Sequence, residues 1–331
     1  MYSLKDIAGG LSGLHFERQE GPDKLIFWSH SDRGPNNDEI EDHELGITKR
    51  PFLKPGFQPF WVQFSFNRKT SEIKVIQTIG LTLPDGSPMT GLPNKDGDEV
   101  PIDIHGNELK RDINGIDPES LCFDGTHFWM GEEYGPSILK FNPKGQLLRR
   151  YVPEGSYPGV NSEIFKRTLP KDLLKRKVNR GFEGLTCKDG KVYAILQSPL
   201  KKEGRDVRIF EFDPRTEQVL GEFLYPVDSK KSDKIGDMAV MGDSFLVLEQ
   251  NGEVGDKGIH NVYKVNLTSL DNDGRLKKIL VKDLVTAGYS FAEKVEGLTV
   301  IGPNEIAVIN DNDFGVNDAA LKSILGIFNL D

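Results

Sequence analysis

Short apolar runs separated by polar turns recur along the whole chain. Typical runs are Lys191–Leu196, Arg208–Asp213 and Ser244–Leu248, which are rich in β-branched and aromatic residues and are bounded by glycine, aspartate or proline. Runs of this length between turn-forming residues predict β-strands. Apolar residues at helical spacing are scarce; the segment Phe165–Lys177 has them, but Pro170 interrupts it. The pattern therefore predicts an all-β chain.

The runs are grouped into a repeated unit of four short strands. One apolar residue marks the same place in each copy: Leu14, Leu121, Leu185, Met238 and Leu298. Their spacings of 107, 64, 53 and 60 residues are, with one exception, close to the length of four strands with their loops. Successive units of this kind indicate a β-propeller, whose radial closure protects the sheet edges. We therefore predict a β-propeller of four-stranded blades.

The number of blades depends on the longest spacing, which contains a Pro/Gly/Asp-rich insertion at about residues 84–113. Its prolines argue against a further set of paired strands, so five blades are preferred and six remain the alternative. The last unit shows only three strands before Asp331. We expect Tyr2–Ile7 to supply the missing outer strand and to close the ring. The whole chain, residues 1–331, is expected to form this single domain.

Charge and composition exclude several kinds of partner. Lys and Arg total 42 against 51 Asp and Glu, and the net charge of −9 argues against nucleic acid as a partner. No apolar run approaches the roughly 18 residues that span a bilayer, so no membrane segment is expected. The first residues also lack the basic and then apolar pattern of a signal peptide. The two cysteines, Cys122 and Cys187, are too few for a disulfide framework or a zinc site, and we expect them to be small buried apolar side chains in strands.

Polar residues recur at two equivalent places in the units, the start of the innermost strand and the end of the strand that follows. Innermost strands of a propeller line its central channel, so carboxylates there converge and repel one another unless a cation is present. Ca²⁺ is the natural partner because it takes six to eight oxygen ligands. The predicted metal ligands are Glu119, Glu183, Asp237 and Glu296, with Glu132, Glu249, Asp311 and Asp313 near them.

A structural role is the alternative for the same carboxylates, which could instead accept hydrogen bonds from loop backbone N–H groups at blade junctions. The segment Asn310–Gly315 alternates side-chain oxygens as a calcium loop does. It lacks the full EF-hand spacing, which needs a third ligand and a glutamate at position 12. Both readings of the acidic residues therefore stay open.

Three arginines lie beside the recurrent acidic positions or on a loop that leaves one: Arg33, Arg180 and Arg205. Guanidinium groups next to a bound cation would form a pocket for phosphate or carboxylate, although surface ion pairs are the alternative. Tyr134 is a possible acid–base group near the same rim. The chain has no Gly-x-Ser-x-Gly elbow, His-Glu-x-x-His motif or phosphate loop, so those chemistries are not supported.

Several segments, in the right order, resemble one family. They are Gly9–Leu14, Asp117–Glu119, Gly131–Ile138, Asn179–Leu185, Ile235–Met238 and Asn310–Gly315. Together they resemble the phytase-like domain family, described as having esterase-like activity of phytase, from about residue 9 to 330. The resemblance implies a β-propeller and hydrolysis of phosphate or carboxylate esters. Members are commonly exported, which leaves export and a cytoplasmic location both open for this chain.

These observations favour a metal-dependent hydrolase of phosphate or other small esters, with Ca²⁺ in the channel. A small anionic or ester substrate is the expected partner, and the oligomeric state stays open. A non-catalytic propeller that binds a ligand or protein at its channel mouth is the alternative, because no partnered serine or histidine nucleophile can be identified. A lactonase-type propeller with a single catalytic metal is the third possibility.

Overall fold

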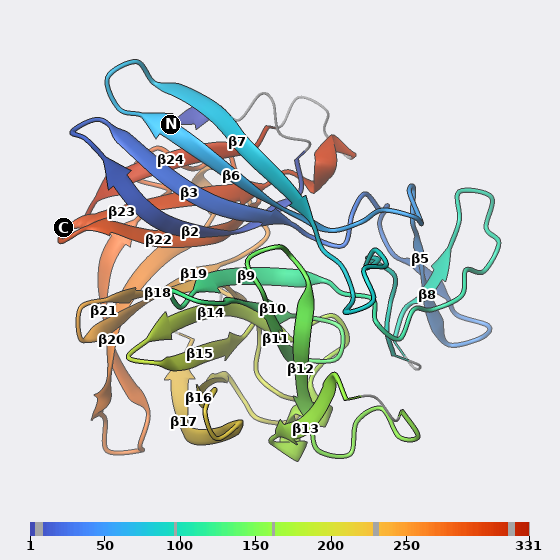
Figure 1. Ribbon diagram of the computed structural model, residues 1–331. Helices are drawn as coiled ribbons and strands as arrows, with labels where there is room; N and C mark the ends of the chain where they lie inside the picture. The colour runs from blue at the N-terminus through green and yellow to red at the C-terminus, as the bar shows by residue number, and fades with distance from the viewer. Residues whose placement is uncertain (4–8, 96–97, 161–162, 228–231, 317–321, 331) are drawn as a thin grey trace.

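The computed structural model describes residues 1–3, 9–95, 98–160, 163–227, 232–316 and 322–330, and these form an all-β protein (Figure 1). The helical segments in this part of the chain are three short 3₁₀ turns, Lys171–Lys175, Gly255–Lys257 and Asp313–Gly315. Among the described residues no helix is long and apolar enough to cross a membrane. The all-β class predicted from the apolar runs is confirmed.

Most strands belong to small sheets in which consecutive strands pair in antiparallel order. The first sheet contains β2 (Leu11–Glu20), β3 (Lys24–Ser31), β6 (Phe60–Asn67) and β7 (Glu72–Gly80). The second contains β9 (Pro118–Phe123), β10 (Phe128–Glu132), β11 (Ser137–Phe141) and β12 (Leu147–Pro153), with β13 (Phe165–Leu169) added in parallel. The third contains β14 (Phe182–Lys188), β15 (Lys191–Leu196), β16 (Asp206–Asp213) and β17 (Gln218–Pro226).

The remaining strands complete the same pattern. The fourth sheet contains β18 (Lys234–Met241), β19 (Ser244–Gln250), β20 (His260–Leu270) and β21 (Leu276–Asp283). The fifth contains β22 (Lys294–Gly302), β23 (Glu305–Asp311), β24 (Ile324–Asn329) and the N-terminal β1 (Tyr2–Ser3). β1 pairs with β24 through Tyr2–Leu325 and Ser3–Ile324, and the rest of the strand expected over residues 2–7 lies outside the described residues.

The first long strand of each sheet faces the molecular centre, which gives the arrangement of a β-propeller (Figure 1). These innermost strands contact one another in the cyclic order β2, β9, β14, β18, β22 and back to β2. The five repeat-marking residues, from Leu14 to Leu298, all lie on these strands and are buried. Burial falls outward within a sheet, since β3 is buried along nearly its whole length while the outer strand of the same sheet, β7, is largely exposed. Packing of apolar faces between neighbouring sheets therefore forms the core.

The insertion at about 84–113 does not add a further four-stranded sheet. It contributes β8 (Val100–Ile102), which pairs in parallel with β5 (Ile47–Pro51), and β5 pairs with β4 (Ile40–Asp42). This three-stranded sheet stands beside the ring in Figure 1. At Gly91 a Cβ atom would lie 1.7 Å from the carbonyl oxygen of Arg33, so the insertion packs directly against the chain that leaves β3.

The two cysteines are joined in a disulfide between β9 and β14, the innermost strands of neighbouring sheets. Their Cα atoms are 6.0 Å apart, and 65 residues separate Cys122 from Cys187 in the sequence. Both cysteines lie in strands, as expected, but the prediction that they act only as small apolar side chains was wrong. The reason is geometric, because the repeat places them at neighbouring points on two adjacent innermost strands.

Candidate functional site

A polar cavity of about 280 Å³ lies where the innermost strands begin and the strands after them end. Carboxylate, guanidinium, ammonium and amide side chains from all five sheets line it. No histidine, serine, cysteine or tyrosine is among the described residues that line it. The repeat-marking residues, such as Leu121 and Leu298, lie around a separate, more apolar cavity farther along the same strands. The recurrent polar positions therefore gather at one end of the molecule.

A first carboxylate group consists of Asp117, Glu119 and Glu133, whose oxygen atoms lie within 4.8 Å of one another. The antiparallel pairing of Glu132 with Pro118 brings the end of β10 beside the start of β9. The Glu133 N–H donates to the Asp117 carbonyl at 3.0 Å, which fixes these two ends together. All three carboxylates are buried. Neighbouring strand ends thus assemble the group from separate parts of the sequence.

Burial strongly disfavours ionisation of this group when no cation is present. Burial, together with the nearby Asp117 and Glu183 carboxylates, raises the pKa of Glu119 well above its usual value. Burial and Asp117 raise the pKa of Glu133 to about 8, although Arg180 opposes the shift. Burial also raises the pKa of Asp117 against the opposing effect of Arg33. A divalent cation would favour the ionised form of all three.

Two acceptor atoms beside this group have no hydrogen-bond partner. The Gln197 amide donates from Nε2 to Glu133 Oε1 at 3.0 Å and to Glu183 Oε2 at 2.6 Å. The Oε1 atoms of Gln197 and Glu183 are left buried and unpartnered, in side chains that are only 5% and 1% exposed. Buried polar atoms nearly always have a partner, so this pair of oxygens fits a cation site.

The Ser12 hydroxyl links two further carboxylates. Its Oγ lies 2.5 Å from Glu119 Oε2 and 2.9 Å from Glu296 Oε2. A hydroxyl has one proton to donate, so one of the two contacts needs a protonated carboxyl group or a longer separation. Ser12 on β2 therefore joins the carboxylates of the two innermost strands that flank it, Glu119 on β9 and Glu296 on β22.

A second carboxylate group, Asp32, Asp311 and Asp313, lines the same cavity. Lys294 Nζ lies 2.6 Å from Asp313 Oδ1 and 3.5 Å from Asp311 Oδ2. Burial acts to raise the pKa of Asp313, but Lys294 outweighs it and the pKa is lowered. This group is paired with Lys294, just as Asp117 of the first group is paired with Arg33.

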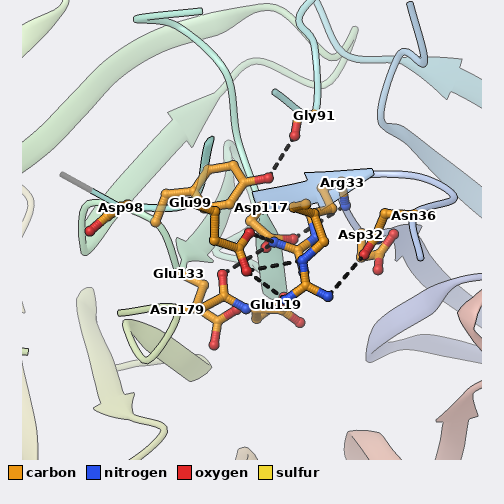
Figure 2. A network of polar contacts seen from close by, with 12 residues as sticks. Asp32, Arg33, Asn36, Gly91, Asp98, Glu99, Asp117, Glu119, Glu133 and Asn179 are labelled. Carbon is orange, nitrogen blue, oxygen red and sulfur yellow. Dashed lines mark hydrogen bonds and ion pairs between the residues drawn. The ribbon is translucent and has the colours of Figure 1, made fainter. Parts of the chain in front are cut away.

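The predicted cationic residues have different surroundings. Arg33 is buried, and its Nη1 lies 3.1 Å from Asp117 Oδ2, 3.2 Å from Glu99 Oε2 and 3.2 Å from Asn179 Oδ1 (Figure 2). Arg180 lines the cavity with a side chain that is 41% exposed, and its Nη1 is 4.0 Å from Glu133 Oε1. Arg180 is therefore the more accessible of the two to a ligand.

Other predicted residues lie away from the cavity lining. Arg205 donates to the Ser232 carbonyl, and the buried Tyr134 hydroxyl donates to the Gly91 carbonyl at 2.7 Å. Asp237 accepts from the backbone N–H groups of Met238 and Leu298, both at 2.7 Å. Asp237 thus matches the structural role that we held as the alternative.

Two glutamates at the ends of second strands are held in the same way. Glu132 accepts from the Tyr134 N–H at 3.0 Å and from the Ser137 hydroxyl at 2.8 Å. Glu249 accepts from the Tyr225 hydroxyl at 2.7 Å and pairs with Lys278. Neither glutamate is among the described residues that line the cavity.

Several cavity residues were not among the predicted ligands. They are Asp32, Asp117, Glu133, Gln197, Lys294 and, next to them, Glu99. Asp117 and Lys294 each stand two residues before a predicted glutamate, and Glu133 directly follows another. A wider window would have found Asp117 and Lys294. Glu133, like Asp32 and Gln197, already stands at a recurrent position, the end of a second strand, but was not included in the predicted ligand set. Glu99 lies in the insertion, outside the repeat, and has no such signal.

The chain is similar to proteins of several kinds. An uncharacterized secreted protein of Arthroderma benhamiae is 30% identical over 241 residues, which are 60% of this chain, and the chain spans 46% of that protein's length. Glutaminyl cyclase from Myxococcus xanthus is 10% identical over 97% of this chain and 98% of its own, with a TM-score of 0.43. CoXyl43, a β-xylosidase/α-arabinofuranosidase from a compost microbial metagenome, is 9% identical over 98% and 92%, with a TM-score of 0.48. Residues 7–314 match the phytase-like family, described as esterase-like activity of phytase, and the chain belongs to that family.

Proposed function

We propose that the polar cavity is the site of a metal-dependent hydrolase that acts on phosphate or other small esters. The observation that carries this proposal is the first carboxylate group, Asp117, Glu119 and Glu133, buried beside the two unpartnered oxygens of Glu183 and Gln197. An acidic cluster alone is common, but unpartnered buried acceptors next to one call for a cation. The family's esterase-like description supports an ester substrate.

Ca²⁺ is the proposed metal because every donor atom here is an oxygen, the ligand type that this ion prefers. Asp117, Glu119 and Glu133 would hold it, with Glu183 and Gln197 completing the set. When bound, such an ion polarises an ester oxygen and lowers the pKa of a coordinated water. In that arrangement the residues that hold the ion would take the place of the serine or histidine that other hydrolases use.

The chain's own residues would bind and orient the substrate. Arg180, which is half-exposed at the cavity wall, is suited to hold an anionic group through its guanidinium fork. Arg33 is already engaged by Asp117, Glu99 and Asn179, so its role would be to orient Asp117. Of the three predicted arginines, we therefore assign substrate contact to Arg180.

We also propose that the five larger sheets are the five blades of the propeller and that β1 closes the ring. The cyclic contacts of the innermost strands and the pairing of β1 with β24 support this proposal. The small sheet of β4, β5 and β8 would then be an addition beside the ring rather than a sixth blade.

The test is a hydrolysis panel of a phosphomonoester, short acyl esters and a lactone, each assayed with Ca²⁺ and with chelator. We expect hydrolysis that needs Ca²⁺ and that Glu133→Gln reduces at least a hundredfold, while the exposed control Glu44→Gln stays at the wild-type rate. Activity indifferent to chelator and to Glu133→Gln would contradict the proposal. Preference for the lactone with one tight metal site would favour the lactonase-type reading.

A binding function without catalysis is the second candidate. The observation in its favour is that the described residues lining the cavity include no serine, histidine or cysteine that could act as a nucleophile. A ligand that raises the melting temperature without being turned over, in the presence of Ca²⁺, would favour this function over hydrolysis.

A further inference from the structure

The insertion contacts the cavity wall through Glu99, which directly precedes β8 and pairs with the cavity residue Arg33. Its side chain is 2% exposed and lies between two guanidinium groups. Glu99 Oε2 is 3.2 Å from Arg33 Nη1, and Glu99 Oε1 accepts from Arg50 Nε at 3.0 Å and from Arg50 Nη2 at 2.5 Å. A buried carboxylate with this many charged donors is ionised and fixed in position. Accordingly, Arg33 and Arg50 lower the pKa of Glu99 in spite of its burial.

Arg33 connects Glu99 to the first carboxylate group. Figure 2 shows Arg33 next to both Glu99 and Asp117, and its Nη1 contacts these two carboxylates and Asn179. The same guanidinium lies over the Tyr134 ring, 5.7 Å from its centre. Arg33 is therefore held from three sides, and its position fixes one oxygen of Asp117.

The insertion is anchored so that Glu99 cannot easily move away. Gly91 packs against the Arg33 carbonyl with no room for a side chain, and the Tyr134 hydroxyl donates to the Gly91 carbonyl. Arg176 pairs with Asp98, the residue before Glu99. Arg111 Nη2 donates to the Glu99 carbonyl at 3.1 Å. These contacts come from both the ring and the insertion.

The charges explain why Glu99 matters for a cation site. If Arg33 faced Asp117 alone, its full positive charge would neutralise that carboxylate and repel a metal ion. Arg33 and Arg50 together face three carboxylates, those of Glu99, Asp117 and Glu39. The carboxylates therefore outnumber the guanidinium groups, and Asp117 keeps negative charge available for a ligand. We infer that Glu99 is a positioning residue that acts through Arg33 on Asp117. The insertion that carries Glu99 would therefore contribute to metal binding. This inference rests on the proposed metal site.

The experiment measures the Ca²⁺ dissociation constant by isothermal titration calorimetry of the full chain. Removing a partner that orients a metal ligand typically weakens metal affinity about 10–100-fold. We expect Glu99→Gln to weaken Ca²⁺ binding at least tenfold. The control Glu108→Gln removes the same charge from an exposed position in the same insertion and should leave the affinity unchanged. Melting in chelator shows whether each variant is folded.

A double-mutant cycle separates positioning from a merely structural role. In an Asp117→Asn background, Glu99→Gln should cost much less affinity, since the residue through which it acts is already changed. Equal losses in the two backgrounds would overturn the inference. If Glu99→Gln does not fold, Arg33→Lys takes its place. Glu99 and Asp117 both contact Nη1 of Arg33, and the shorter, differently shaped lysine side chain would not place its ammonium group at that point, so an affinity within twofold of wild type would overturn the inference.

The two proposals fail in different ways. If the wild-type protein binds no Ca²⁺, the metal site is absent, and both the proposed function and the role of Glu99 are overturned. If the wild-type protein binds Ca²⁺ and Glu99→Gln binds it equally well, only the role of Glu99 is overturned.

Discussion

At the scale of single residues, equivalent places in the repeat do not imply equivalent roles. Glu119 and Asp237 both stand near the start of an innermost strand, yet only Glu119 reaches the cavity. The shorter aspartate side chain instead accepts hydrogen bonds from two backbone N–H groups, one on its own strand and one on β22. Asp237 directly precedes its repeat-marking residue Met238, whereas Glu119 stands two residues before Leu121, and this difference in register separates their roles.

The first prediction concerns Asp237. Asp237→Asn replaces one of the two oxygens that accept from buried backbone N–H groups with an amide donor, so we expect the free energy of unfolding to fall by about 1–3 kcal/mol. The increase in stability caused by Ca²⁺ should be unchanged, because Asp237 does not line the cavity. Urea unfolding with and without Ca²⁺ measures both quantities. A lost calcium response in this variant would return Asp237 to the metal site.

The second prediction concerns pH and Glu133, whose pKa is raised to about 8 in the folded protein. The folded state then binds a proton that the unfolded state releases near its ordinary pKa of about 4.3. Stability of the metal-free protein is therefore expected to fall as the pH rises from about 5 to 8, by at most about 1.4 kcal/mol per pH unit for this group. Urea unfolding in chelator at several pH values measures this slope. Glu133→Gln should reduce this dependence of stability on pH. An equal slope in that variant would contradict the assignment of the raised pKa to Glu133.

At the scale of elements, local pattern predicted the strands well and the contacts between distant segments poorly. Strands such as β15 and β19 follow from apolar runs between turns, because their signal is local. The partners Arg33 and Glu99 are 66 residues apart, and Cys122 and Cys187 are 65 apart. The sequence around one partner of such a pair does not indicate the other partner. These contacts therefore follow only from how the folded sheets pack together.

The third prediction concerns the link between β9 and β14. A disulfide that closes a loop of this length restricts the unfolded chain, and its loss is expected to cost about 4 kcal/mol. We expect the double variant Cys122→Ser with Cys187→Ser to melt at a lower temperature than the oxidised wild type. Reducing the wild type should give a similar decrease, and reductant should leave the double variant unchanged. Equal melting of oxidised and reduced wild type would contradict a stabilising disulfide.

At the scale of the whole molecule, most of what could be predicted about the site came from the spacing of the repeated units. Spacing alone placed Glu119, Glu183 and Glu296 around one axis, and Glu119 and Glu296 share the Ser12 hydroxyl there. Asp117 was not predicted as a ligand because it lies two residues before the recurrent position of Glu119. Glu133 shares a recurrent position with Glu132 but was not included in the predicted ligand set, and both residues lie on loops that bend into the cavity. The repeat therefore predicts which strands surround the central axis. The loops at the ends of these strands determine which carboxylate oxygens come together in the cavity.

The last prediction joins metal and stability. If the first carboxylate group holds Ca²⁺, an ion present at 1,000 times its dissociation constant adds about 4 kcal/mol to the folded state. For 331 residues, about 1.4 °C of melting temperature corresponds to each kcal/mol, so chelation should lower the melting temperature by about 6 °C. The difference should shrink at pH 5, because the raised pKa values of Glu119 and Glu133 leave them protonated and unable to bind the ion. Glu183→Gln should blunt the response, and Glu44→Gln should not. Identical melting in chelator and in millimolar Ca²⁺ at neutral pH would mean that these carboxylates only hold neighbouring sheets together.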